Sequence, residues 1–206
     1  MHQKHRVPAS ITVALVLIGL LAWPVIAQSP TASTVTGQAT GVQATVLGIL
    51  GTATTTTLAD TGTLADTSDA RDASLDTGSV PSLLAGEVLS ATTIGYPDEV
   101  DSAASLAGLN LNVAGVGVSA DFVMAEASQV LGAAGSGTSY IDNLAINGTP
   151  VFVSGDPNQT IAIPGGQVIV NEQTISSSGA TVVNALHVIV NGVADVVIAS
   201  ATAGIS

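Results

Sequence analysis

Two runs of Val and Ile joined by an Asn-Gly pair, within Thr181 to Ala201, constrain the fold of this chain more than any other feature. Asn191-Gly192 favours a two-residue type I′ hairpin turn, because both central residues of that turn need a positive φ and its twist matches that of the strands. Such a turn would place Asp195 opposite Val188 and would turn His187 to the other face. The sequence therefore predicts an antiparallel strand pair at the end of the chain, with His187 and Asp195 on opposite sides.

Both faces of this predicted hairpin are mainly apolar. One face is expected to carry Leu186, Val188, Val190, Val193, Asp195 and Val197, and the other Ala185, His187, Ile189, Ala194, Val196 and Ile198. Apolar side chains on both faces are typical of an interior strand pair in a sandwich or barrel.

A second Asn-Gly pair predicts another hairpin around Asn147-Gly148, with Ile146 opposite Thr149. Pro150 follows directly, and its missing N–H could not serve a strand on the other side. The strand predicted at Val151 to Val153 is therefore expected at a sheet edge.

Further β-branched or apolar runs, bounded by Gly, Pro, Asn and Asp, predict the remaining strands. These runs are Gln38–Leu50, Thr52–Leu58, Leu83–Tyr96, Ala103–Val113, Val116–Val130, Thr160–Ile163 and Gln167–Gln173. The composition of 122–134 also suits a helix, but we expect a strand there. Turn signals every 8 to 12 residues predict an all-β, antiparallel β-sandwich or a Greek-key or barrel-like single domain.

The N-terminus has the pattern of an export signal. Basic residues precede an apolar run from Ile11 to Trp23, and small residues follow, so we expect a signal peptide over 1–27. An uncleaved membrane anchor is the alternative, because the run is at the short limit for a span. We expect a flexible leader over 28–37, a single β-rich domain over 38–206, and no membrane span in the mature chain.

Charge and residue usage exclude several classes of function. The chain has a net charge of −12, and beyond residue 27 Arg71 is the only basic side chain. Nucleic acid is therefore excluded as a partner, because phosphate contacts require Lys and Arg. The chain has no cysteine, so thiol chemistry is excluded. With only four aromatic residues beyond Trp23, the core has to be aliphatic, and an aromatic sugar-binding platform is not expected.

An acidic surface loop is predicted at about 58–80. It repeats TLADTG, TLADTS and SLDTG, too few copies for a solenoid. Its acids, Asp60, Asp66, Asp69, Asp72 and Asp76, could collect Ca²⁺, although their spacing lacks the alternating pattern of a preformed calcium loop.

The chain offers few residues of the types that form catalytic sites. His187 is the one histidine beyond the signal region, and the predicted register puts no acid on its face, so we interpret it as a hydrogen-bonded structural residue. One histidine without cysteine excludes the usual zinc sites. Carboxylate pairs could hydrolyse glycosides, with Glu87, Glu99, Glu126 and Glu172 as candidates. We therefore assign no catalytic, cofactor-binding or metal-binding residue, and we expect no enzyme activity and no cofactor.

Blocks of sequence between about Leu83 and Ile205 resemble the choice-of-anchor P family of secreted bacterial proteins. The blocks are GLNLNVAGVGVSADFVMAEA, SYIDNLAINGTPV, DPNQTIAIPGGQVIVNEQ and TVVNALHVIVNG, and they occur in the family's order. The resemblance implies an exported β-rich domain of unknown activity, often attached to the cell surface by a C-terminal anchor. This chain ends after its last predicted strand, so we expect free secretion rather than anchoring.

Together these features predict an extracellular structural or adhesive β-domain. Its expected partners are itself or other cell-surface proteins, reached through an exposed strand edge. Two alternatives stay open: a Ca²⁺-dependent or ligand-binding module that uses the Asp60–Asp76 loop, and a carboxylate-dependent hydrolase.

Overall fold

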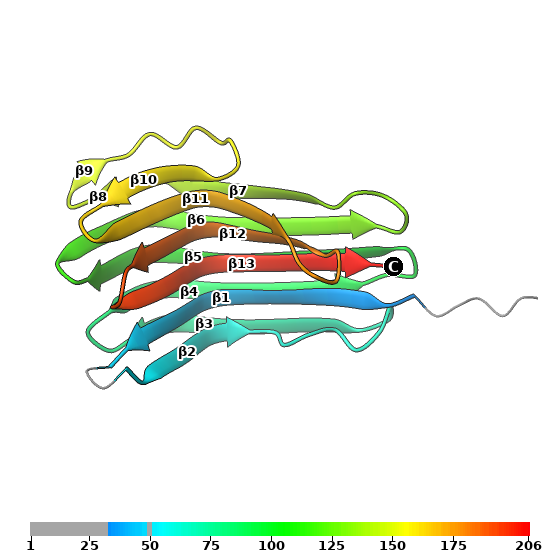
Figure 1. Ribbon diagram of the computed structural model, residues 1–206. Coiled ribbons are helices and arrows are strands. Elements are labelled where there is room, and N and C mark those ends of the chain that lie inside the picture. The colour runs from blue at the N-terminus through cyan, green and yellow to red at the C-terminus, as the bar shows by residue number, and fades with distance from the viewer. Residues whose placement is uncertain (1–32, 49–50) are drawn as a thin grey trace, which may run out of the picture. The chain divides into compact units, whose positions relative to one another are not determined.

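The computed structural model describes residues 33–48 and 51–206, so the expected signal peptide and the first part of the leader lie outside the described residues. The described residues form two antiparallel sheets and no helix (Figure 1). In the six-stranded sheet the order is β10 (Gln159–Ile163), β11 (Gly166–Ile175), β12 (Thr181–Val190), β13 (Ala194–Ile205), β1 (Val35–Leu47) and β2 (Ala53–Asp60). In the seven-stranded sheet it is β3 (Ala70–Val80), β4 (Leu84–Gly95), β5 (Glu99–Val113), β6 (Val116–Val130), β8 (Ala145–Ile146) and β9 (Thr149–Pro150), and β7 (Ser136–Asp142) also pairs with β6.

The two sheets pack face to face, which confirms the predicted all-β sandwich. Strand β13 packs against β5 and β6, and β1 packs against β4 and β5. The core between them is aliphatic, as expected, and its largest fully buried side chains include Leu89, Leu106, Leu111, Leu186 and Ile198. Residues 122–130, for which a helix was the alternative, belong to β6.

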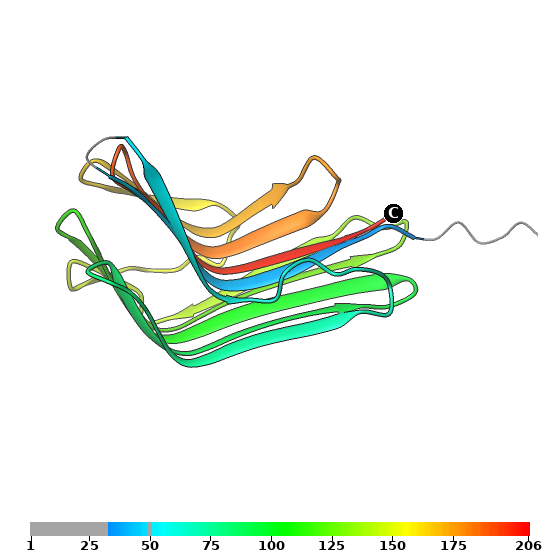
Figure 2. The same cartoon turned by 90° about the horizontal axis from the view of Figure 1, so that it is seen from below.

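Both sheets bend sharply along one line, as Figure 2 shows. In the six-stranded sheet Ala59, Asn171 and Ala199 have φ values of 50°, 52° and 53° at this line. In the seven-stranded sheet Val88 and Gly108 have φ values of 47° and 59°. A residue with a positive φ inside a strand turns the chain, and the repetition of such residues across neighbouring strands bends each sheet as a whole.

The bend interrupts the alternation of side chains along each strand. The consecutive residues Ala185 and Leu186 are both fully buried, and so are Ile198 and Ala199. Alternation with period two, on which the predicted faces of the last hairpin relied, therefore holds on each side of the bend but shifts by one residue across it.

The last hairpin differs from its prediction. Val190 pairs with Ala194, so the loop has three residues, 191–193, instead of two. Within it only Gly192 has a positive φ, of 71°, whereas a type I′ turn would also require one at Asn191. The predicted register is therefore wrong by one residue on the β13 side.

The longer loop is hydrogen-bonded to the β10–β11 turn and to β1. The N–H of Asn191 donates to the carbonyl of Gly165 at 2.9 Å, and the carbonyl of Val193 accepts the N–H of Leu47 at 2.8 Å. The loop is thus bonded to both neighbours of the hairpin, and these contacts outweigh the local preference of the Asn-Gly pair.

The second hairpin has the predicted turn. Asn147 and Gly148 have φ values of 50° and 73°, and Ile146 pairs with Thr149, which is a type I′ arrangement. The edge position is also confirmed, because β9 ends the sheet order. However, β9 stops at Pro150, and the predicted strand at 151–153 is irregular.

The acidic loop is shorter than predicted. Residues 58–60 belong to β2 and residues 70–80 form β3, which leaves the loop at 61–69. Across the part of the chain that the structure describes, no helix is long and apolar enough to span a membrane.

Candidate functional site

A polar network centred on His187 crosses the outer face of the six-stranded sheet. The Nδ1 atom of His187 lies 2.8 Å from Oε2 of Glu172, and its Nε2 atom lies 2.9 Å from Oδ1 of Asp195. Asn184 adds a fourth member, because its amide Nδ2 donates to the same Glu172 oxygen at 2.6 Å. The network therefore links β11, β12 and β13 through side chains alone.

Strand register brings these residues together. Glu172 pairs directly with Asn184, and Asp195 pairs with Ile189, two residues from His187 on the same face. The side chain of His187 is 13% exposed, that of Glu172 18% and that of Asp195 56%. The expectation that His187 has no acid on its face is thus wrong, because it relied on the two-residue loop.

The arrangement fixes where protons can lie. A carboxylate oxygen only accepts, so each contact with His187 needs a proton between its two atoms. Both contacts exist together when both ring nitrogens carry a proton, or when one of the carboxyl groups is protonated. With both nitrogens bound to acids, no Ser or Thr hydroxyl hydrogen-bonds to His187 among the described residues. The hydrogen bonds of the network therefore tie three neighbouring strands together.

The sequence contains a signal for one contact of this network, that of His187 with Asp195. Gly192 also suits a three-residue loop with one positive φ. That loop would have moved Asp195 opposite Ile189, onto the face of His187. The contribution of Glu172 could not have been found in this way, because it depends on the pairing of β11 with β12.

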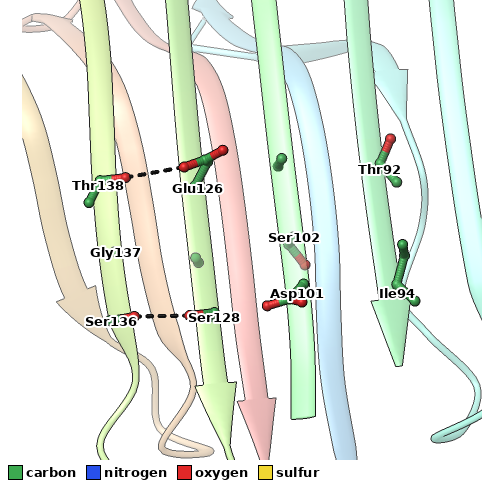
Figure 3. A pocket seen from close by; sticks show the side chains of 11 residues that line it. Thr92, Ile94, Asp101, Ser102, Glu126, Ser128, Ser136, Gly137 and Thr138 are labelled. Carbon is green, nitrogen blue, oxygen red and sulfur yellow. Dashed lines mark hydrogen bonds between the residues drawn. The ribbon is translucent and has the colours of Figure 1, made fainter. Parts of the chain in front are cut away.

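A second polar feature is a shallow hollow of about 490 Å³ on the seven-stranded sheet (Figure 3). Its lining from β4, β5, β6 and β7 consists of Thr92, Ile94, Asp101, Ser102, Ala103, Glu126, Ala127, Ser128, Ser136, Gly137 and Thr138. Asp101 pairs with Ser128 and Ala103 pairs with Glu126, so the two acids lie diagonally across β5 and β6. The hydroxyl of Thr138 donates to Oε2 of Glu126 at 3.4 Å.

The four candidate glutamates are therefore separated by the fold. Glu126 lies in the hollow and Glu172 in the His187 network. Glu87 belongs to β4, at an irregularity of the β4–β5 pairing near the bend, and Glu99 begins β5. The structure thus brings none of these four together, and Asp101 is the acid that joins Glu126.

Hydrogen bonds within the chain occupy the acids of the 61–69 loop. Asp66 accepts the hydroxyl of Ser68 at 2.7 Å and its N–H at 2.8 Å, and these bonds lower the pKa of its carboxyl below the ordinary 3.8. Asp69 accepts the N–H of Ala65 at 2.8 Å and pairs with Arg71 at 2.7 Å, which lowers its pKa as well.

The remaining acids of this region are dispersed. Asp60 accepts hydrogen bonds from Gln38, Thr40 and the N–H of Gly62, whereas Asp72 and Asp76 are exposed on β3. In residues 33–48 and 51–206, no three His, Asp or Glu side chains come close enough to hold a metal ion.

Comparisons with known proteins leave the chain without an assigned relative. No family model, no curated protein and no solved structure matches it.

Proposed function

We propose that this chain is an exported, extracellular structural or adhesive β-domain without catalytic activity, which acts by contact with other copies or with cell-surface proteins. The observation that carries the proposal is the position of His187. Both of its ring nitrogens are bound to acids on neighbouring strands, at 2.8 and 2.9 Å. The chain thus uses its one described histidine as a cross-strand tie.

Two further features support this proposal. Residues 33–48 and 51–206 form strands around an aliphatic core, and the longest connection between two of these strands is the loop at 61–69. The export signal over 1–27 and the resemblance to the choice-of-anchor P family are the reasons for placing the protein outside the cell. Free secretion, with loose attachment to the surface, is part of the same proposal.

Localisation tests this proposal directly. The full chain, expressed in a bacterium with its own N-terminus, is expected in the culture medium or in the material released from cells by a salt wash. Retention of the whole chain inside the cells would contradict the proposal. A version that lacks residues 1–27 is the control and is expected to stay inside.

One observation favours a second candidate, a carboxylate-dependent hydrolase. Asp101 and Glu126 share the hollow of Figure 3 and lie diagonally on adjacent strands. Diagonal neighbours lie about 7–8 Å apart, with their Cβ atoms somewhat closer, and glycosidases use carboxyl groups about 5–9.5 Å apart. A panel of chromogenic glycosides would test it, with Glu126→Gln and Asp101→Asn as inactive controls. An activity that both variants retain would exclude this site, and an inactive wild-type chain would leave the structural proposal as it is.

A further inference from the structure

We propose that a second copy of this chain pairs with the free edge of β2. The two β2 strands would run antiparallel about a two-fold axis and join two six-stranded sheets into one. This inference rests on the proposed structural function, and it specifies the edge, the partner and the register.

The free edge of β2 presents unused backbone groups. Among the described residues, β2 pairs with β1 alone. The N–H of Gly48 points toward β2 and donates to the carbonyl of Thr52. The N–H of Leu47, the preceding residue, points away from β2 and donates to the carbonyl of Val193. Because this direction alternates along an antiparallel pair, the backbone groups of Ala53, Thr55 and Thr57 point away from β1, toward the edge.

Two edges of the seven-stranded sheet are protected against pairing. The edge of β7 is covered where the side chain amide of Gln173, from the other sheet, donates to the carbonyl of Gly137 at 2.9 Å. The edge of β9 is two residues long and includes Pro150, which has no N–H to offer.

The remaining two edges are protected by charge or by their length. Strand β3 carries Arg71, Asp72 and Asp76, and charges on an edge oppose pairing with another chain. Strand β10 has five residues and is followed by Pro164. The side chain of Gln159, at the start of β10, also holds the irregular segment 152–154 through two hydrogen bonds.

Strand β2 has none of these protections. Residues 52–59, TATTTTLA, contain no charge, no proline and no glycine. Five of these eight residues are threonines, which are β-branched and suit extended pairing. A segment of high β-propensity and low charge at an exposed edge is the kind that pairs with another chain.

A second copy fits this edge better than another partner because the strand is complementary to itself. An antiparallel arrangement centred on Thr55 pairs Ala53 with Thr57 of the other copy and Thr55 with its own equivalent. All three outward-pointing residues then bond across the axis. Thr54 also faces Thr56 of the other copy, and Thr–Thr pairs stabilise sheets.

Charge also favours this arrangement. The chain has a net charge of −12, so two copies repel each other wherever their acids approach. Because segment 52–59 carries no charge, two copies can approach each other there without this repulsion. In the antiparallel register the Asp60 side chains of the two copies lie at opposite ends of the new pairing and not opposite each other.

Sedimentation of the full chain over a wide concentration range tests the inference. We expect a monomer–dimer equilibrium that shifts toward the dimer as salt screens the acidic charges. Thr57→Pro should raise the dimer dissociation constant at least about tenfold, because proline at an outward-pointing residue keeps the β1–β2 bonds but removes an edge donor. Thr55→Lys should act in the same direction, and it serves as an independent variant if the proline also disturbs β2.

Ser119→Lys is the matched control, because Ser119 is exposed on β6, an interior strand. It should leave the dimer dissociation constant within about twofold of the wild-type value. A wild-type chain that stays monomeric at every concentration would overturn the inference, and so would edge variants that associate like the control. Neither result bears on export, which the localisation experiment measures separately.

Discussion

Glu172 and His187 face each other across β11 and β12, with Oε2 2.8 Å from Nδ1 on the outer face of the six-stranded sheet. We expect His187→Gln to lower the free energy of unfolding by about 1–3 kcal/mol, because it takes a hydrogen-bonded partner from a mostly buried carboxyl group. Urea unfolding followed by circular dichroism measures this change. An unchanged free energy of unfolding would show that the network does not tie the strands together.

The two acids of the network should contribute unequally. Glu172 is 18% exposed and also accepts a hydrogen bond from Asn184, whereas Asp195 is 56% exposed. We therefore expect Asp195→Asn to cost less than about 1 kcal/mol, and Glu172→Gln to cost more. Double-mutant cycles with His187→Gln measure the coupling of each pair. A larger coupling with Asp195 than with Glu172 would contradict this ranking.

The 61–69 loop should loosen in acid. Hydrogen bonds from Ser68 lower the pKa of Asp66, and those from Ala65 and Arg71 lower that of Asp69. A carboxyl group whose pKa is lowered in the folded loop stabilises that loop at pH values above the ordinary pKa of 3.8. This stabilisation is lost as the pH falls through the lowered pKa. We expect the backbone amides of Ala65 and Ser68 to be protected from hydrogen exchange at pH 5. Well below pH 3.8 their exchange should approach the intrinsic rate. Loss of protection already above that pH would contradict the assignment.

We expect position 166, where β11 lies very close to β12, to tolerate no side chain. A Cβ atom at Gly166 would overlap the carbonyl oxygen of Ile189 and lie 2.8 Å from its carbonyl carbon, so the backbone itself would have to move. We expect Gly166→Ala to destabilise the fold by about 1–3 kcal/mol or more.

Gly117→Ala is the matched control for Gly166→Ala. At Gly117 the nearest contact of an added Cβ would be Asn147 Oδ1 at 3.8 Å. Thermal unfolding of both variants measures the difference, and similar melting temperatures would show that the strands can separate at Gly166 without cost.

The two Asn-Gly turns should respond differently to the same change. Asn147 has a φ of 50° and its Oδ1 accepts the N–H of Gly117 at 2.8 Å, whereas Asn191 lacks a positive φ. We therefore expect Asn147→Ala to cost about 1–2 kcal/mol and Asn191→Ala to cost well under about 1 kcal/mol. Chemical denaturation measures both, and equal costs would contradict the difference between the turns.

Local patterns predicted most of the strands. Runs of β-branched residues located β2, β6, β11 and β12, and the Asn-Gly pair at 147–148 predicted a turn of the observed type. Composition also predicted that the core is aliphatic, and among the described residues no aromatic side chain is buried in it. These features depend on neighbours in sequence, which one chain displays directly.

Features that depend on distant strands could not be predicted. The loop at 191–193 donates a hydrogen bond to Gly165 and accepts one from Leu47, both far away in the sequence. The bend moves the buried positions of a strand from one side-chain face to the other. The site at His187 needs both the three-residue loop and the pairing of β11 with β12. The edge predicted next to the Asn147-Gly148 turn is present, but its strand stops at Pro150 and does not reach 151–153.

The pairing of β1 with β13 determines how the domain would respond to a pulling force. Thr34 and Ser206 exchange two backbone hydrogen bonds, of 2.8 and 3.0 Å, so both ends of the described domain leave from the same point of one antiparallel pair. Tension between these ends would separate the two strands starting from this end. Their hydrogen bonds would break one after another instead of bearing the force together. A tether that holds this domain by one end only would leave that pair unloaded.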